Sequence, residues 1–294
     1  MPLPETEIIA LLARLGVDEV RALAPVAGGF DTEIWQVAHG DDLTSALRIF
    51  RADQELSAIF ERIAMSAAAG ALPVPELRAS VSWNGRPVSL LEWLPGLPLG
   101  AALFASPSQA WELGELLGQA QARLHQLPAP AGLDDFGERW SRWAGTEPPE
   151  GTRGQQLLHG DFHPMNVLVD AGQISGVIDW TNAGSGDPRL DAARTVAIMS
   201  AATLPETELG YDEMEEIRSQ LIEGWQAGYE SIAGPLEAFE PFLVWAATVT
   251  IHDLSQKSPT LPGIGLMIER LRALRAIWSG ETRDDEEMEE SEFS

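Results

Sequence analysis

The segment HGDFHPMNVLVDAGQISGVIDW, which runs from His159 to Trp180, constrains the fold more than any other part of the chain. It is built like a β-hairpin, yet Asp161 lies five residues before Asn166, and Asp179 closes the apolar run SGVID. A carboxylate without a partner is costly at the end of a short buried strand. These side chains therefore either cap turns or together hold a positively charged group.

The composition sets broad limits on the kind of protein. A chain of 294 residues, 45% of them hydrophobic, has room for one large domain or two modest ones. Because the sequence has no cysteine, disulfide bonds and thiolate metal sites are excluded. The N-terminus has no basic leader, and no run free of both charged residues and proline approaches ~20 residues. We therefore expect a cytoplasmic protein without a membrane span.

The net charge of −26 argues against a nucleic-acid partner, because phosphate backbones require lysine and arginine. Residues 281–294 contain eight acidic residues and one arginine, which predicts a disordered acidic tail. The remaining chain is still acidic, which favours either cationic ligands or solubility alone. Lys257 is the only lysine, so a basic group in the first half must be arginine or histidine.

Residues 30–95 combine short strand-like runs with one helix. The dipeptide Asn84-Gly85 is a strong signal for a two-residue hairpin turn. The helix has an apolar stripe that we expect to face the core, and it stops at Gly70. Its stripe consists of Leu56, Ile59, Phe60, Ile63 and Ala67, and the predicted elements are strands at 32–39 and 44–51, the helix at 55–70, and strands at 76–83 and 86–94.

From residue 95 onward the pattern is mostly helical. Residues 111–127 carry one apolar stripe, and helices are predicted over most of 188–278. The sequence therefore predicts an α+β fold of two lobes. We expect an N-terminal lobe at 1–94 with an antiparallel sheet and a helix, and a mostly helical C-terminal lobe at 95–280.

The pattern of the segment 159–180 matches the needs of phosphoryl transfer. One carboxylate must orient the attacking hydroxyl and accept its proton, while a second carboxylate and an amide hold Mg²⁺ against the nucleotide phosphates. The spacing from Asp161 to Asn166, with Asp179 at the end of a later strand, provides these groups.

With these residues in view, the chain resembles the aminoglycoside phosphotransferase / choline kinase family. HGDFHPMN at 159–166 and VIDW at 177–180 are followed by GDPRLDAA at 186–193. Further matches follow in the family's order and span the chain from about Val26 to Trp278. The resemblance implies a protein-kinase-like two-lobed fold, ATP or GTP as co-substrate, Mg²⁺, and a small-molecule hydroxyl as acceptor.

The resemblance also implies roles for individual residues. Asp161 would be the catalytic base, His159 would orient its loop, and Asn166 and Asp179 would bind Mg²⁺. Two further acids would brace the catalytic segment, with Asp191 accepting backbone N–H bonds. These two supporting residues are Asp187 and Asp191.

Arg48 departs from the family pattern, because the resemblance places a lysine at this strand position. Arginine keeps its charge and can contact two phosphate oxygens at once. Its implied partner is Glu61 on the following helix. Glu61 lies off the apolar stripe of that helix, which also suits a solvated glutamate, and Glu55 is the alternative partner.

Other nucleotide contacts follow from the resemblance alone. Backbone groups of Glu92, Trp93 and Leu94 would hold the base. Gly28 and Gly29 would let their loop approach the phosphates, although a hairpin turn explains the two glycines equally well.

Two other functions compete with the kinase interpretation. A zinc hydrolase could use His159, Asp161 and His163, but this leaves Asn166 and Asp179 without a role. A catalytically inactive kinase fold could serve as a binding module, a possibility that Arg48 suggests.

The identity of the acceptor stays open at this level. The acidic body favours a cationic acceptor such as an aminoglycoside, with Asp253 as a candidate contact. The alternatives are a macrolide, a sugar, homoserine or choline, and the many tryptophans would suit an acceptor of low charge. The sequence gives no indication of the oligomeric state.

Overall fold

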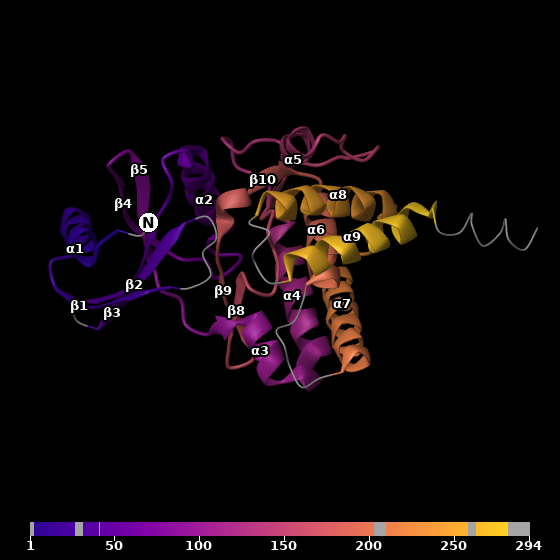
Figure 1. The fold of residues 1–294 in the computed structure, drawn as a ribbon, viewed down its shortest axis with the longest axis horizontal. Helices are drawn as coiled ribbons and strands as arrows, with labels where there is room; N and C mark the ends of the chain where they lie inside the picture. The colour runs from indigo at the N-terminus through magenta and orange to yellow at the C-terminus, as the bar shows by residue number, and fades with distance from the viewer. Residues whose placement is uncertain (1–2, 27–31, 41, 203–209, 258–262, 282–294) are drawn as a thin grey trace, which may run out of the picture.

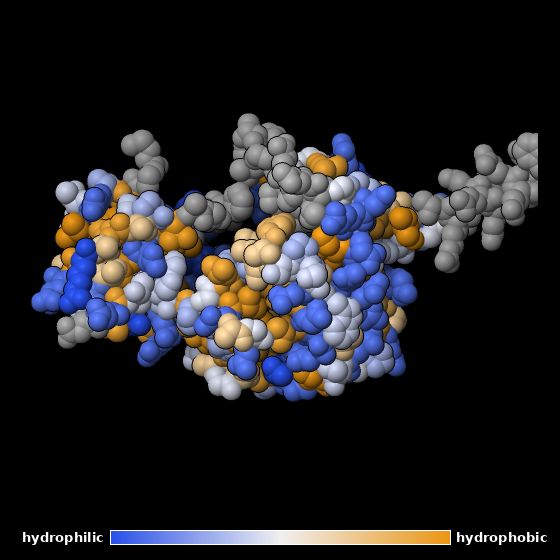
Figure 2. Space-filling model, turned by 90° about the horizontal axis from the view of Figure 1, so that it is seen from below, coloured by the Kyte–Doolittle hydropathy of each residue, from blue (hydrophilic) through white to orange (hydrophobic). Residues whose placement is uncertain are grey.

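A computed structural model describes residues 3–26, 32–40, 42–202, 210–257 and 263–281 (Figure 1). The N-terminal part is built on a five-stranded antiparallel sheet with the order β1-β2-β3-β5-β4. The C-terminal part is mostly helical, so the predicted α+β fold of two lobes is confirmed. In the space-filling view the two parts are distinct masses that meet along a narrower region (Figure 2). The strands of the sheet are β1 (Val20–Pro25), β2 (Glu33–His39), β3 (Leu43–Ile49), β4 (Leu77–Trp83) and β5 (Arg86–Glu92).

Both predicted hairpins are present in this sheet. β2 pairs with β3, and β4 pairs with β5 across the turn at Asn84 and Gly85. Both turn residues have positive φ, 50° for Asn84 and 76° for Gly85. This conformation is typical of the tight turn that an Asn-Gly pair favours, because its twist matches that of the flanking strands.

The structure adds helix α1 (Glu5–Arg14) and strand β1, neither of which the sequence patterns predicted. Ile8, Leu11 and Leu12 of α1 are fully buried against one face of the sheet. The helix closes this core and leaves the opposite face of the sheet toward α2 and the C-terminal part.

Helix α2 (Glu55–Ala68) confirms the predicted element but corrects its buried face. Leu56, which we expected in the core, has 64% of its surface exposed, whereas Glu61 is only 1% exposed. The buried face contains Ala58, Phe60, Ala64 and other small or apolar residues. Helix α2 contacts two parts of the protein, so its buried residues do not form a single apolar stripe. Its buried face also includes Glu61, the polar partner of the buried cation Arg48.

The C-terminal part positions the segment 159–180 between helices. The predicted strands of this segment are present as β8 (Val167–Asp170) and β9 (Gln173–Val177), which pair with each other, and a second small sheet joins β7 (Gln156–Leu158) to β10 (Gly184–Gly186). The remaining elements are β6 (Leu97–Pro98), α3 (Leu99–Ala105), the 3₁₀ turn η1 (Pro107–Gln109), α4 (Ala110–Leu124), α5 (Phe136–Ala144), the 3₁₀ turn η2 (Trp180–Asn182), α6 (Pro188–Ala201), α7 (Tyr211–Ala233), α8 (Glu240–Gln256) and α9 (Ile264–Ser279).

Glycines allow α4 and α7 to pack closely. A methyl group added at Gly118 would meet the carbonyl oxygen of Trp225, and one added at Gly228 would meet the carbonyl oxygen of Glu115. Backbones this close leave no room for a side chain, so these glycines fix the distance between the two helices.

Along the chain, β5 is the last strand of the five-stranded sheet and ends at Glu92. The next element, β6, begins at Leu97. This is where the sequence suggested the boundary between 1–94 and 95–280, which stays a prediction. The predicted acidic tail lies outside the described residues from 282 onward. None of the described helices is both long and apolar enough to span a bilayer.

Candidate active site

The loop between β7 and β8 carries Asp161 and is held from behind by Asp191 of α6. The carboxylate of Asp191 accepts hydrogen bonds from the backbone N–H groups of His159 (3.1 Å) and Gly160 (2.8 Å). Nε2 of His125 lies 3.0 Å from the same carboxylate. Burial alone would raise the pKa of Asp191, but these hydrogen bonds lower it. Asp191 therefore accepts backbone N–H bonds as predicted, while its role in bracing the catalytic segment stays a prediction.

His159 is fully buried at the start of the loop. Its Nε2 donates to the carbonyl oxygen of Ile178 at 3.0 Å, and its Nδ1 accepts from the N–H of Asp161 at 3.2 Å. Burial lowers its pKa, which keeps the imidazole neutral as these two bonds require. Both ring nitrogens are used, so His159 ties the loop to the end of β9 and is no zinc ligand. In the described part of the chain, no three histidines and acids are placed to bind a metal.

Asp161 and Asn166 are brought together by the loop. Nδ2 of Asn166 donates to the backbone oxygen of Asp161 (3.0 Å) and to its Oδ2 (3.2 Å). The amide oxygen of Asn166 and Oδ1 of Asp161 accept no hydrogen bond from the residues described. Each residue therefore has one oxygen available for another group.

Asp161 is held in its charged form. Burial alone would raise its pKa, but His163, whose Nε2 lies 3.5 Å from Oδ2, and Arg194 hold the pKa of Asp161 well below its usual range. A carboxylate that stays ionised can orient a hydroxyl through its open oxygen.

Asp179 follows β9 in a left-handed conformation with φ of 64°. Such a conformation is uncommon for a residue other than glycine, although asparagine and aspartate adopt it more readily than most. Oδ1 of Asp179 accepts hydrogen bonds from Arg48 and Thr181, each at 2.8 Å. The backbone also brings the two candidate metal ligands together, because the N–H of Ile178 donates to the backbone oxygen of Asn166 at 2.9 Å.

Arg48 links three elements. Its Nη1 donates to Glu61 of α2 at 2.6 Å, and its Nη2 donates to Asp179 at 2.8 Å. The predicted pair of Arg48 and Glu61 is therefore present, while Glu55 is exposed at the start of α2. Burial raises the pKa of Glu61 to about 7, with the charge of Arg48 opposing the shift. Burial alone would also raise the pKa of Asp179, but the charge and hydrogen bond of Arg48, with the hydrogen bond of Thr181, lower it.

The structure describes most of the other predicted residues. Asp187 caps α6 by accepting from the N–H of Arg189 at 2.9 Å, as a supporting residue would. In the predicted base-binding segment, the N–H of Glu92 donates to Glu76 at 2.8 Å, and Trp93 is partly exposed. Leu94 lies beside Gly176 of β9. Gly28 and Gly29 lie outside the described residues.

Asp253 of α8 lies near Asp161 through a shared neighbour, Arg194 of α6. Its Oδ2 lies 3.4 Å from Nζ of Lys257 and 3.9 Å from Nη2 of Arg194. The same nitrogen of Arg194 lies 3.9 Å from Oδ1 of Asp161. Arg194 and His163 are therefore part of the site, although the sequence patterns did not single out Arg194 and considered His163 only as a zinc ligand. An arginine three residues after Asp191, in a helix made largely of alanine and other small residues, was the signal available.

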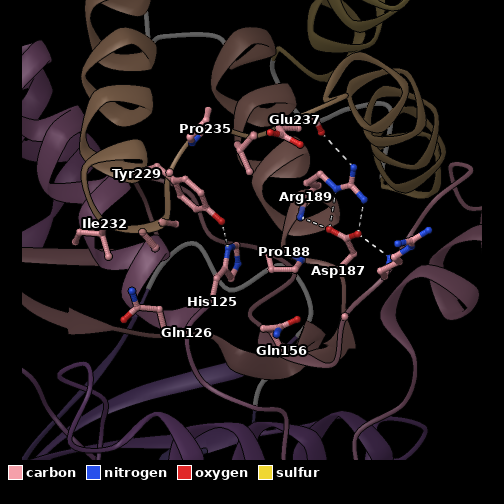
Figure 3. Close-up of a pocket in the computed structure, with 16 residues that line it drawn as sticks. His125, Gln126, Gln156, Asp187, Pro188, Arg189, Tyr229, Ile232, Pro235 and Glu237 are labelled. Atoms are coloured by element: carbon pink, nitrogen blue, oxygen red, sulfur yellow. Dashed lines mark hydrogen bonds and ion pairs between the residues drawn. The ribbon is translucent and has the colours of Figure 1, made fainter.

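A separate cavity of about 700 Å³ lies beside Asp187 (Figure 3). It is bordered by His125, whose Nδ1 lies 2.8 Å from the hydroxyl of Tyr229. The cavity contacts neither the loop residues 159–166 nor Asp179. Its residues support Asp191 and α6 from behind, so the cavity is distinct from the candidate active site.

A family model and several solved structures match this chain. The model of the family described as "Phosphotransferase enzyme family" matches residues 22–147 and 133–235, which is well over half of the chain. The uncharacterized protein YcbJ of Bacillus subtilis (strain 168) is 38% identical over 55 residues. That match spans only 18% of this chain and 18% of YcbJ.

Several solved structures share the fold at low sequence identity. Aminoglycoside phosphotransferase APH(4)-Ia is 14% identical, with 92% of this chain and 98% of that chain covered and a TM-score of 0.67. Amicoumacin kinase hAmiN, solved with AMP-PNP, Ca²⁺ and Ami, is 13% identical over 94% of both chains, with a TM-score of 0.63. Macrolide 2'-phosphotransferase MphH from Brachybacterium faecium is 20% identical, with 94% and 95% covered and a TM-score of 0.58.

Proposed function

The chain belongs to the phosphotransferase enzyme family, and we propose that it transfers the γ-phosphoryl group of ATP, or of GTP, to a hydroxyl group of a small molecule. One observation carries the proposal. Arg48 of the N-terminal sheet is bonded to both Glu61 and Asp179, while the loop of Asp161 and Asn166 is tied to the same strand end. A nucleotide-binding charge, a metal-binding carboxylate and a base thus belong to one network.

The N-terminal lobe, residues 1–94, binds the nucleotide in this proposal. Arg48 is positioned by Glu61 and places a permanent positive charge beside Asp179, where it would stabilise the phosphates. The backbone of Glu92, Trp93 and Leu94 would hold the base where β5 ends, and Gly28 and Gly29 would cover the phosphates. Residues 95–280 supply the catalytic loop and the acceptor side.

The residues fit a magnesium ion. Mg²⁺ prefers oxygen ligands and is usually held by one or two protein side chains together with substrate phosphates. The amide oxygen of Asn166 and Oδ2 of Asp179 accept no hydrogen bond from the described residues, so a hard oxygen ligand is available on each. When bound, the ion would neutralise charge on the phosphates. The complex of amicoumacin kinase with AMP-PNP and Ca²⁺ supports a divalent metal in this fold.

Asp161 acts as the base. Oδ1 is its open oxygen, so the acceptor hydroxyl would donate its proton there, and the hydroxyl oxygen would form the new bond to the γ-phosphorus. The bond from that phosphorus to the β–γ bridging oxygen breaks, which yields a phosphate ester and the nucleoside diphosphate. Because the transition state of phosphoryl transfer is loose, a weakly basic carboxylate is sufficient to orient the hydroxyl and accept the proton late.

For the acceptor, the surroundings of Asp253 support a molecule of low charge. The acidic composition suggested an aminoglycoside, and aminoglycoside phosphotransferase APH(4)-Ia has been solved with hygromycin B. Here, however, Lys257 and Arg194 face the carboxylate of Asp253 and balance its charge. Trp143, 43% exposed, packs edge-on against His252 and offers an apolar surface nearby. These neighbours favour a sugar-like or macrolide-like acceptor, with the carboxylate of Asp253 accepting hydrogen bonds from its hydroxyls.

The test measures the release of ADP or GDP from Mg-nucleotide with different acceptors. One pair, such as glucose and glucosamine, differs in a single ammonium group. A macrolide and hygromycin B complete the panel. We expect turnover with uncharged or singly charged acceptors. Turnover restricted to hygromycin B would contradict the assignment of the acceptor, and failure to bind any Mg-nucleotide would contradict the kinase function itself.

A further inference from the structure

Arg194 is a buried cation without an obvious structural reason for its charge. It is 1% exposed on α6, among alanine, valine and other small residues. Burying a guanidinium group is costly unless its hydrogen bonds and its charge are compensated. The contacts of Arg194 therefore indicate what its charge serves.

Three elements fix the guanidinium of Arg194 in place. Nε donates to the carbonyl oxygen of Gly160 at 2.9 Å, in the loop that carries Asp161. Nη1 lies 3.4 Å from the hydroxyl of Thr250 on α8. The group also lies over the ring of Trp140 on α5, 4.0 Å from its centre, which is a favourable cation–π distance. The orientation of the guanidinium is therefore determined by the loop, α5 and α8 together.

The remaining nitrogen, Nη2, is aimed between two carboxylates. It lies 3.9 Å from Oδ1 of Asp161 and 3.9 Å from Oδ2 of Asp253. Although it is buried, it makes no hydrogen bond with the residues described. At this distance it attracts both carboxylates by charge, while the lone pairs of Oδ1 on Asp161 stay open.

We propose that Arg194 is a positioning residue for catalysis, which holds Asp161 and Asp253 at a fixed separation and keeps Oδ1 of Asp161 open to the acceptor hydroxyl. The inference rests on the proposed function for the role of Asp161. Equal attraction to the two carboxylates is essential, because a direct bond from Nη2 to Asp161 would occupy the oxygen that must accept the proton. Asp253 thus acts on the base through Arg194 as well as facing the acceptor.

Two variants of Arg194 separate positioning from simple packing. Arg194→Met keeps a long side chain over Trp140 but removes the charge, and Arg194→Lys restores the charge. A misplaced base costs about 100-fold in rate, so we expect R194M to lower kcat by about 100-fold while the KM for ATP stays within about twofold. R194K should recover at least about tenfold of that loss. The rate is followed as ADP release from Mg-ATP, with water and with the best acceptor of the panel above.

Arg218→Met is the matched control, because Arg218 is a 9% exposed arginine of α7 that bonds the carbonyl oxygen of Ala202. We expect it to lower the thermal midpoint without changing kcat per folded molecule. Wild-type kcat in folded R194M would overturn the proposal, as would an R194K variant no more active than R194M.

Asp253→Asn tests the equal attraction of Nη2 to the two carboxylates, even if the variants of Arg194 do not fold. Without the charge of Asp253, Nη2 is drawn to Oδ1 of Asp161, so with water as acceptor kcat should fall by about tenfold. Unchanged ADP release in D253N would contradict the proposal. Crystal structures of D253N and wild type give a readout without turnover: Nη2 within hydrogen-bond distance of Asp161 in the variant supports the proposal, and an unmoved guanidinium overturns it. An inactive wild type would contradict the proposed function. The comparison of the two crystal structures would still decide the role of Arg194.

Discussion

Nη2 of Arg48 lies 2.8 Å from Oδ1 of Asp179, and these two residues are 131 positions apart in the chain. Arg48 belongs to the central strand β3 of the N-terminal sheet, and Asp179 follows the hairpin of the C-terminal part. The bond thus joins the two lobes at the point where the proposed nucleotide phosphates and metal would meet. It also offsets the cost of burying the guanidinium of Arg48, which is only 5% exposed.

Replacing Arg48 with lysine should weaken nucleotide binding. A single ammonium group lacks the planar fork that bonds Glu61 and Asp179 at the same time, so we expect the KM for ATP to rise by about tenfold with a smaller change in kcat. Steady-state ADP release measures both constants. Arg51→Lys, at an arginine whose side chain is 54% exposed, is the matched control and should leave both unchanged. An unaltered KM for ATP in R48K would show that nucleotide binding does not need a guanidinium bonded to both Glu61 and Asp179.

Replacing Asp161 with alanine should nearly abolish transfer. Loss of a general base costs about 10²- to 10⁴-fold in kcat, whereas the affinity for nucleotide should stay nearly unchanged because Asp161 faces the acceptor. Turnover and the binding of a fluorescent ATP analogue measure the two effects separately. Asp170→Ala, at the exposed end of β8, serves as the control. A D161A enzyme that keeps wild-type turnover would remove the role assigned to Asp161.

The sequence predicted the hairpin of the segment 159–180 and the grouping of its polar side chains because their constraints are local. Asp161, Asn166 and Asp179 lie within one loop and hairpin, so spacing along the chain nearly determines their separation in space. The hairpin at Asn84-Gly85 was predictable for the same reason, since the two residues specify the turn by themselves.

Contacts between distant elements could not be predicted in this way. The pair of Arg48 and Glu61 followed only from the resemblance, and the helical pattern of α2 pointed to a different face, because Leu56 is exposed and Glu61 is buried. Arg194 was overlooked because its partners lie on the loop, on α5 and on α8. A residue whose role depends on three elements gives no periodic signal.

Glu61 should make the stability of the protein depend on pH. Its pKa is about 7 in the folded protein against a reference value of 4.5, so the folded state binds more protons than the unfolded state between these values. Its contribution to stability is complete below about 4.5 and is lost as the pH rises through about 7. Compared with Glu61→Gln, the wild type should lose about 1 kcal/mol of unfolding free energy per pH unit over this range.

Urea unfolding of both proteins at several pH values between 4.5 and 8 gives this difference directly. Glu55→Gln, at an exposed position of the same helix, is the control and should follow the wild-type curve. Parallel curves for E61Q and the wild type would mean that Glu61 has the same charge in the folded and unfolded protein.

Gly118→Ala should destabilise the C-terminal part. The added methyl group would meet the backbone of Trp225, which belongs to α7 and cannot move aside as a flexible side chain could. Forcing such a group into a packed interface costs about 1–3 kcal/mol. Thermal or urea unfolding measures the loss, and turnover per folded molecule should stay near normal because neither Gly118 nor Trp225 is among the residues assigned to the candidate site.

Gly265→Ala provides the opposite case in the same chain. Gly265 lies in α9, has nothing within 4 Å of the position of an added Cβ, and lacks a positive φ. Alanine is favoured over glycine in a helix by up to about 1 kcal/mol, so G265A should be neutral or slightly more stable. A G118A protein as stable as G265A would show that α4 and α7 can separate without cost, and that their close packing does not support the fold.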